Sequence, residues 1–140
     1  MKKKVFLLIA FISLSLSAQN KEYAGNYFLF HETEKGEILD YKLELNNDGT
    51  FQFTSYRKDI GKNEYHRQSK GKWTVINKVI HFTSENIDLE DKKALDFTST
   101  TARVFKKSPR NKSAEVKPTF LQFYKSKIFW IENLKILKKE

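Results

Sequence analysis

Residues 41–53 read YKLELNNDGTFQF, and this stretch decides the fold. Apolar and polar side chains alternate on both sides of a short polar connection, Asn46-Asn47-Asp48-Gly49. Alternation with a period of two is typical of a β-strand with one buried face. Glycine readily adopts the positive φ that a tight connection between two twisted strands requires. The stretch therefore predicts a β-hairpin in which Phe51 and Phe53 face a core.

The same alternation recurs along the chain. Trp73 and Val75, then Ile80 and Phe82, predict a second hairpin around the turn Asn77-Lys78. Residues 120–124 and 128–131 predict a third hairpin, and residues 95–97 and 102–105 predict further strands. Residues 85–93 fit a polar loop better than the alternative, a short helical turn, and residues 108–118 are expected to be a loop. Roughly eight to ten short strands at intervals near a dozen residues predict an all-β fold, a single antiparallel β-barrel or half-barrel.

The first 18 residues predict an export signal. Three lysines at positions 2–4 precede an apolar run at residues 5–12, and small residues follow as far as Ala18. This order of charged, apolar and small residues is typical of a secretory signal peptide. The apolar stretch is shorter than the roughly 20 residues that a membrane-spanning helix needs. We expect cleavage between Ala18 and Gln19, a mature domain of residues 19–140 without a transmembrane segment, and a periplasmic or secreted location.

The composition restricts the chemistry of this domain. The chain has no cysteine, which excludes disulfides, thiolate metal sites, iron–sulfur clusters, a catalytic thiol and a cysteine-linked lipid anchor. Its 12 Phe, 6 Tyr and 2 Trp provide enough apolar surface for a folded core. The formal net charge of +9 includes the three lysines at positions 2–4, so the mature domain carries +6. We expect one basic, well-packed domain.

Three short motifs resemble those of a known family. They are Gly25-Asn26-Tyr27, Asp48-Gly49-Thr50-Phe51 and Gly71-Lys72-Trp73. In this order they resemble the small exported lipocalin-like β-barrel proteins of Bacteroidetes, and they are similar to the N-terminal barrel of envelope copper-stress lipoproteins. The resemblance covers about residues 25–84 and implies a lipocalin-like barrel.

The chain also departs from both patterns. True lipocalins carry Gly-x-Trp in the first strand, where this chain has Gly-x-Tyr, and its tryptophan comes later. The copper-stress lipoproteins have a lipidated cysteine and a Cys-x-x-Cys pair, and this chain has neither. The resemblance therefore implies neither lipid anchoring nor copper handling.

The interior of such a barrel is the first candidate site. A barrel of about eight strands is either filled by side chains or able to hold one small molecule. Alternation places four aromatic residues on the inner face, and these are the candidates for binding a small apolar ligand: Phe51, Phe53, Trp73 and Phe82. A core filled by these side chains is the default interpretation.

Two basic stretches form the second candidate site. The residues expected to contact an anionic partner are Arg57, Lys58, Arg67, Lys70, Arg103, Lys106, Lys107 and Arg110. An acidic glycan, lipid A phosphates or an acidic protein would suit such a surface. Alternatively, lysine-rich strand edges only prevent aggregation and keep the barrel soluble. No recognisable nucleic-acid module surrounds these charges, so we expect no nucleic-acid partner.

No cluster of residues predicts catalysis, a metal or a cofactor. A metal site needs three or four convergent ligands, and His31, His66 and His81 show no spacing that would bring them together. No serine lies in a Gly-x-Ser-x-Gly motif, and nothing selects two opposed carboxylates from the many available. We expect no enzyme activity, no metal and no cofactor.

Three classes of function remain open. The first is a monomeric exported binding module that carries a small apolar ligand or contacts an anionic envelope component. The second is a periplasmic interaction or immunity-type protein that acts through its basic surface. The third is a small hydrolase, which would need a buried carboxylate or histidine in a concave site.

Overall fold

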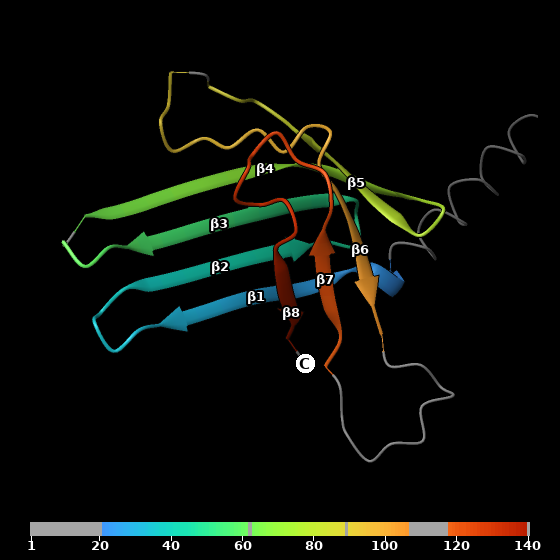
Figure 1. Ribbon diagram of the computed structural model, residues 1–140. Helices are drawn as coiled ribbons and strands as arrows, with labels where there is room; N and C mark the ends of the chain where they lie inside the picture. Colours follow the sequence, from blue (N-terminus) through green and yellow to red (C-terminus); the bar gives the residue numbers. More distant parts are fainter. Residues whose placement is uncertain (1–20, 62, 89, 107–117, 140) are drawn as a thin grey trace, which may run out of the picture.

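The computed structural model, which describes residues 21–61, 63–88, 90–106 and 118–139, is a closed antiparallel barrel of eight strands (Figure 1). The strands are β1 (Gly25–Glu32), β2 (Ile38–Leu45), β3 (Thr50–Lys58), β4 (Glu64–Ile76), β5 (Val79–Ser84), β6 (Thr101–Phe105), β7 (Phe120–Phe123) and β8 (Lys135–Lys138). Each strand pairs with the next along the chain, and β8 pairs with β1 to close the barrel. The predicted all-β antiparallel barrel is confirmed.

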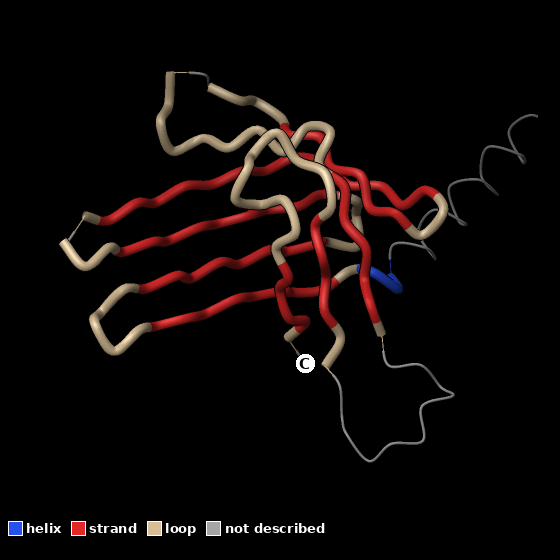
Figure 2. Tube along the Cα trace, in the orientation of Figure 1, coloured by secondary structure: helices blue, strands red, loops and turns tan. Residues whose placement is uncertain are grey.

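Helix is almost absent from these residues. Figure 2 shows one helical turn, at residues 21–23, before β1. Within the ranges described above, no helix has the length and apolar character needed to cross a membrane.

The first four strands are longer than the last four, and this difference shapes the molecule. Strands β1 to β4 have 8, 8, 9 and 13 residues, whereas β6, β7 and β8 have 5, 4 and 4. Figure 1 shows β6, β7 and β8 crossing one part of the long strands, whose far ends continue past them to the β1–β2 and β3–β4 turns. We call these far ends, residues 29–32, 38–41, 55–58 and 64–67, the four-stranded extension.

Gly71 is the point at which β4 begins to pair with β5. Its first part pairs with β3 and its last part with β5, and Gly71 pairs with both Phe51 and Ser84. A side chain at Gly71 would overlap the backbone carbonyl group of Thr83. Glycine is required here because the two backbones approach too closely for a Cβ atom.

We predict that Gly71→Ala destabilises the barrel. The added methyl group must push the β5 backbone away, which we expect to lower the free energy of unfolding by about 1–3 kcal/mol. Gly61→Ala is the matched control, because a Cβ at Gly61 meets nothing within 4 Å and its φ is not positive. Urea unfolding of both variants measures the difference. Equal stability of Gly71→Ala and the unaltered protein would contradict this account of the corner.

Trp73 closes the end of the barrel next to the β2–β3 turn. Its indole Nε1 donates to the backbone carbonyl oxygens of Asn46 and Thr50, at 3.1 and 3.0 Å. Within the turn, Asp48 Oδ1 accepts hydrogen bonds from the Thr50 hydroxyl and backbone N–H, which lower the pKa of Asp48. Gly49 has the positive φ, 85°, expected from the sequence. The hairpin predicted from residues 41–53 is confirmed, and its turn is held against the barrel end by Trp73.

The second predicted hairpin is also confirmed. Strands β4 and β5 are joined by Asn77 and Lys78, with φ of 51° and 65°. Two successive residues of positive φ give the turn type whose twist matches two antiparallel strands. The predicted strand at 102–105 corresponds to β6.

Two predicted strands are wrong, because their apolar residues belong to loops that fill the barrel. Residues 95–97 form no strand, yet Phe97 is fully buried. Residues 128–131 form a turn rather than the second strand of a hairpin, and the partner of β7 is β8, at 135–138. Strand β8 escaped prediction because it contributes one buried side chain, Ile136. In both loops the apolar pattern reflects burial rather than membership of a strand, and the first loop meets β4 through one isolated bridge, Gln68 with Ala94.

Polar contacts fix these two loops over the barrel. The Phe97 backbone N–H donates to the Ser84 hydroxyl at 2.7 Å, which anchors the loop that follows β5. Lys127 pairs with Asp96 at 3.5 Å and so joins the two loops. Residues 85–93 form the predicted loop where the structure describes them, and the predicted loop at 108–118 lies outside the described residues except for Pro118.

Candidate ligand site at the open end of the barrel

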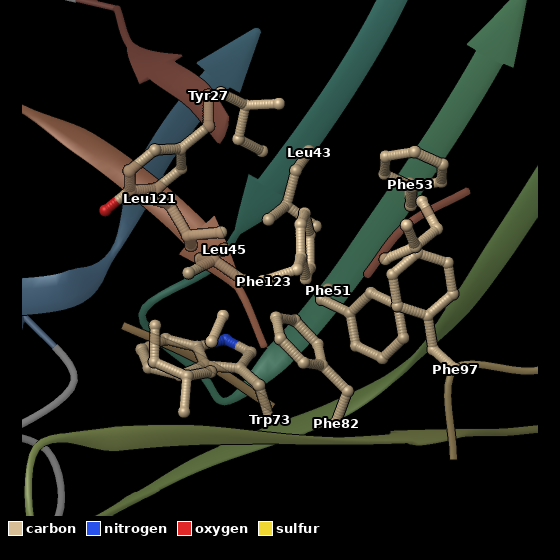
Figure 3. Close-up of a cluster of buried hydrophobic side chains, with 14 of the residues drawn as sticks. Tyr27, Leu43, Leu45, Phe51, Phe53, Trp73, Phe82, Phe97, Leu121 and Phe123 are labelled. Atoms are coloured by element: carbon tan, nitrogen blue, oxygen red, sulfur yellow. The ribbon is translucent and has the colours of Figure 1, made fainter. Parts of the chain in front are cut away.

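The barrel interior is occupied by aromatic side chains. The four predicted interior residues Phe51, Phe53, Trp73 and Phe82 all have an exposed fraction of 2% or less. Phe51 lies 5.1 Å from Phe82 between ring centroids, and Phe97 lies 4.9 Å from Phe53 and 5.6 Å from Phe51. Figure 3 shows these side chains crowded together inside the barrel. Rings at such separations are in contact, so these residues serve as core.

The concave face of the four-stranded extension carries polar and aromatic side chains instead. Strands β3 and β4 continue their alternation past Phe53 and Ser69, which places Ser55 and Arg57 on β3, and Arg67 and Tyr65 on β4, on the same face as the core. Ser55 pairs directly with Arg67, and Arg57 pairs directly with Tyr65. On the other side of β3, Ser55 pairs with Tyr41 of β2. Five side chains thus meet on one concave surface.

The loop between β7 and β8 adds two aromatic side chains to this surface. Trp130 lies 5.3 Å from Tyr41 and 6.3 Å from Phe53 between ring centroids, so it covers the open end of the filled core. Phe129 beside it is 86% exposed. An exposed phenylalanine next to a packed tryptophan provides apolar contact area that the fold itself does not use.

Together these residues enclose a cleft of about 330 Å³. Its lining consists of Tyr41, Ser55, Arg57, Asp59, Tyr65, Arg67, Phe129 and Trp130. An adjoining hollow of about 230 Å³ shares Tyr41, Arg57 and Asp59 with the cleft and extends toward His31. Small-molecule sites usually measure about 300–1,000 Å³ and combine apolar walls with a few polar groups. In size and lining, the cleft fits this description.

The cleft carries a net positive charge. Arg57 Nε donates to Asp59 Oδ1 at 2.9 Å, and this hydrogen bond raises the pKa of the Arg57 guanidinium. Arg67 is half-buried, and within the described ranges no carboxylate forms an ion pair with it. One carboxylate therefore faces two guanidinium groups. A guanidinium with five N–H donors is well suited to a planar anionic group such as a carboxylate.

The pKa of Tyr41 depends on this electrostatic environment. Burial raises the pKa of the Tyr41 phenol, and the nearby Arg57 and Arg67 partly oppose the rise because they favour the charged phenolate. The phenol is thus neutral at physiological pH. It can donate a hydrogen bond to an anion held by the two arginines.

A second hollow, of about 470 Å³, lies along β2, β3 and β4 and is lined mainly by polar and charged side chains such as Lys42, Thr54 and Gln68. Tyr56 and His66 stack there at 4.8 Å between ring centroids, and the Tyr56 hydroxyl donates to Glu64. These side chains satisfy one another on an exposed strand face. Ser55 and Arg67 line both hollows, but of the two only the open-end cleft also has the rings of Phe129 and Trp130 in its lining. The open-end cleft is therefore the better candidate.

The remaining predicted cationic residues do not form one patch with the cleft. Lys58 borders the adjoining hollow, and Lys70 is exposed on β4. Arg103 on β6 lies over the ring of Tyr124, and Lys106 pairs with Glu22 at 3.2 Å. Lys107 and Arg110 lie outside the described residues. Of the predicted contacts that the structure describes, Arg57 and Arg67 line the cleft and the other four do not.

The three histidines lie on different strands. His31 is on β1, His66 is on β4 and His81 is on β5. In the part of the chain that the structure describes, no group of three or more histidine, aspartate or glutamate residues is placed to hold a metal ion.

The sequence predicted part of the cleft. Arg57 and Arg67 were predicted as contacts for an anionic partner, but not as neighbours of the predicted interior, although Arg57 keeps the parity of Phe53 on β3 and Arg67 keeps the parity of Trp73 on β4. Tyr65 lies on the same face of β4 as Arg67, so the same alternation would have placed it in the cleft. Phe129 and Trp130 were not predicted as cleft residues, because the apolar pattern of residues 128–131 resembles that of a strand, whereas these residues form a turn.

Comparisons with known proteins add no template for this site. No protein-family model, curated protein or solved structure matches the chain. The cleft is therefore interpreted from its own geometry.

We predict that Arg67→Gln raises the pKa of Tyr41 further, because it removes a positive charge that favours the phenolate. NMR titration of the tyrosine rings measures the change, and Arg103→Gln, on the exposed face of β6 and outside the cleft lining, is the control. Because the pKa of Tyr41 is raised in the folded protein, folding favours the neutral phenol. The contribution of Tyr41 to the free energy of unfolding is therefore complete below about pH 10, and it is lost as the pH rises through the folded-state pKa. A Tyr41 pKa that falls, or that responds equally to both variants, would contradict the placement of Arg67.

Proposed function

We propose that this protein is a binding protein for a small amphipathic anion, an aromatic or otherwise apolar body that bears a carboxylate, sulfonate or phosphate group. The observation that carries the proposal is the convergence of Arg57 and Arg67 with the exposed ring of Phe129 in one cleft. The guanidinium groups would hold the anion, and the apolar body would lie on Phe129 and Trp130. Such a ligand uses both kinds of side chain that the cleft offers.

The location of the cleft supports binding outside the core rather than within it. Phe51, Phe53 and Phe97 occupy the space that an enclosed apolar ligand would need. A ligand could enter that space only by displacing packed rings. Each large apolar side chain that becomes exposed costs on the order of 1.5–3 kcal/mol. The open-end cleft requires no such rearrangement.

The chemistry of the cleft favours binding over catalysis. The hydrogen bond to Asp59 raises the pKa of the Arg57 guanidinium, and burial raises the pKa of Tyr41 and keeps its phenol neutral. Neither group is suited to accept a proton near pH 7. We propose further that the mature protein starts at Gln19, is exported and acts as a monomer of the lipocalin-like type.

The proposal predicts selective binding of an amphipathic anion. Anilinonaphthalene sulfonate has the required aromatic body and charge, and phenylnaphthylamine has the same body without the sulfonate. Fluorescence titration should give one site per chain for the sulfonate and weaker binding for the neutral compound. Arg67→Gln should weaken sulfonate binding by about tenfold or more, because hydrogen bonds to charged groups contribute about 1.5–3 kcal/mol.

Two further variants separate the cleft from the rest of the surface. Phe129→Ala should weaken both compounds, because the apolar body loses its contact, and Lys78→Gln, at the exposed β4–β5 turn, should change neither. Equal binding of the charged and neutral compounds, or equal effects of Arg67→Gln and Lys78→Gln, would overturn the proposal. Native mass spectrometry of the protein purified from its own host, followed by organic extraction, then identifies the natural ligand.

A further inference from the structure

A band of apolar side chains crosses the outer wall of the barrel where it closes. Phe28 of β1 pairs with Leu137 of β8, Leu137 pairs with Phe120 of β7, and Phe120 pairs with Phe105 of β6. All four alternate with inward-facing residues and so point outward. The rings of Phe105 and Phe120 stack at 4.9 Å between centroids. With Phe30, the next outward residue of β1, these four residues form what we call the seam band.

The fold does not account for the seam band. Phe30 is 56% exposed, and Phe28, Phe105 and Leu137 are each 37–39% exposed. The core is already filled by the inward side chains of the same strands. Outward positions of an antiparallel sheet normally carry polar residues, as β2 does with Asp40, Lys42 and Glu44. A row of directly paired apolar residues on four adjacent strands points to contact with something apolar.

The charges on the β6–β8 side of the seam band are positive. Arg103 and Lys135 point outward there, and strands β6, β7 and β8 contain no acidic residue. Lys135 Nζ lies 5.6 Å from the centroid of the Phe120 ring, so a cation sits within the band itself. On the β1–β2 side the charges are mixed, since Asp40 is the cross-strand partner of Phe30 and pairs with Lys42 at 3.4 Å, and Glu32 is the next outward residue of β1.

We infer that the seam band docks the barrel on the surface of an anionic lipid bilayer. The phenylalanine rings and Leu137 would enter the apolar boundary below the headgroups, and Lys135, Lys139 and Arg103 would contact the lipid phosphates. A convex barrel wall suits a deformable lipid surface better than a rigid partner. This inference is independent of the ligand cleft.

Vesicle flotation tests the inference. The full-length sequence is expressed with its own N-terminal segment and purified as the host processes it, so that every variant shares one N-terminus. It is mixed with vesicles of phosphatidylethanolamine and phosphatidylglycerol, or with neutral phosphatidylcholine vesicles. We expect flotation with the anionic vesicles and at least about fivefold less with the neutral ones, since each cation near an anionic surface contributes about 1 kcal/mol.

Matched variants assign the flotation to the seam band. The double variant Phe30→Gln, Leu137→Gln should lower the vesicle-bound fraction by about tenfold or more. The control Ile76→Gln should leave it unchanged, because Ile76 is 57% exposed, nearly the same as Phe30, and lies outside the band. Near-ultraviolet circular dichroism confirms that each variant is folded.

Three results would overturn the inference. The first is absence of flotation with anionic vesicles. The second is an equal loss of flotation in Ile76→Gln and in the double variant. The third is a protein that is dimeric by light scattering and becomes monomeric in the double variant, which would assign the seam band to a second copy.

Discussion

The close approach of the Gly71 backbone to the Thr83 carbonyl group is the constraint on which the rest of the structure depends. It lies where β4, which pairs with β3 from its first residue, also begins to pair with β5. Because β5 begins to pair only at Gly71, the earlier residues of β4 continue past the closed part of the barrel. The four-stranded extension and its concave face follow from this one corner.

The filled interior then determines where a ligand can bind. Short strands β6 to β8 leave a gap above the core, and two loops close it with Phe97 and Ile131, both fully buried. In the second of these loops, Trp130 packs against Tyr41 and Phe53, and the preceding residue, Phe129, is exposed to solvent. The residues that complete the core and those that build the cleft are therefore neighbours in the same loop.

Sequence patterns predicted the parts of this protein that depend on local pairing. The hairpins at Asp48-Gly49 and Asn77-Lys78 were predictable because turn chemistry and alternation agree at those positions. Phe97 and residues 128–131 were assigned to strands because loops that fill a barrel are as apolar as the strands around them. The cleft was predictable in part: alternation along β3 and β4 aligns Arg57 and Arg67 with the core face, but the loop that brings Phe129 to them is a tertiary feature.

The two tryptophans provide a direct test of the central claim, that ligands bind at the open end and not in the interior. Trp73 lies at the closed end and Trp130 lines the cleft. The fluorine NMR spectrum of fluorotryptophan-labelled protein resolves the two residues while anilinonaphthalene sulfonate is added. The account predicts that the Trp130 resonance shifts with saturation and the Trp73 resonance stays in place. A shift of Trp73 with Trp130 unchanged would place the ligand inside the barrel and contradict the account.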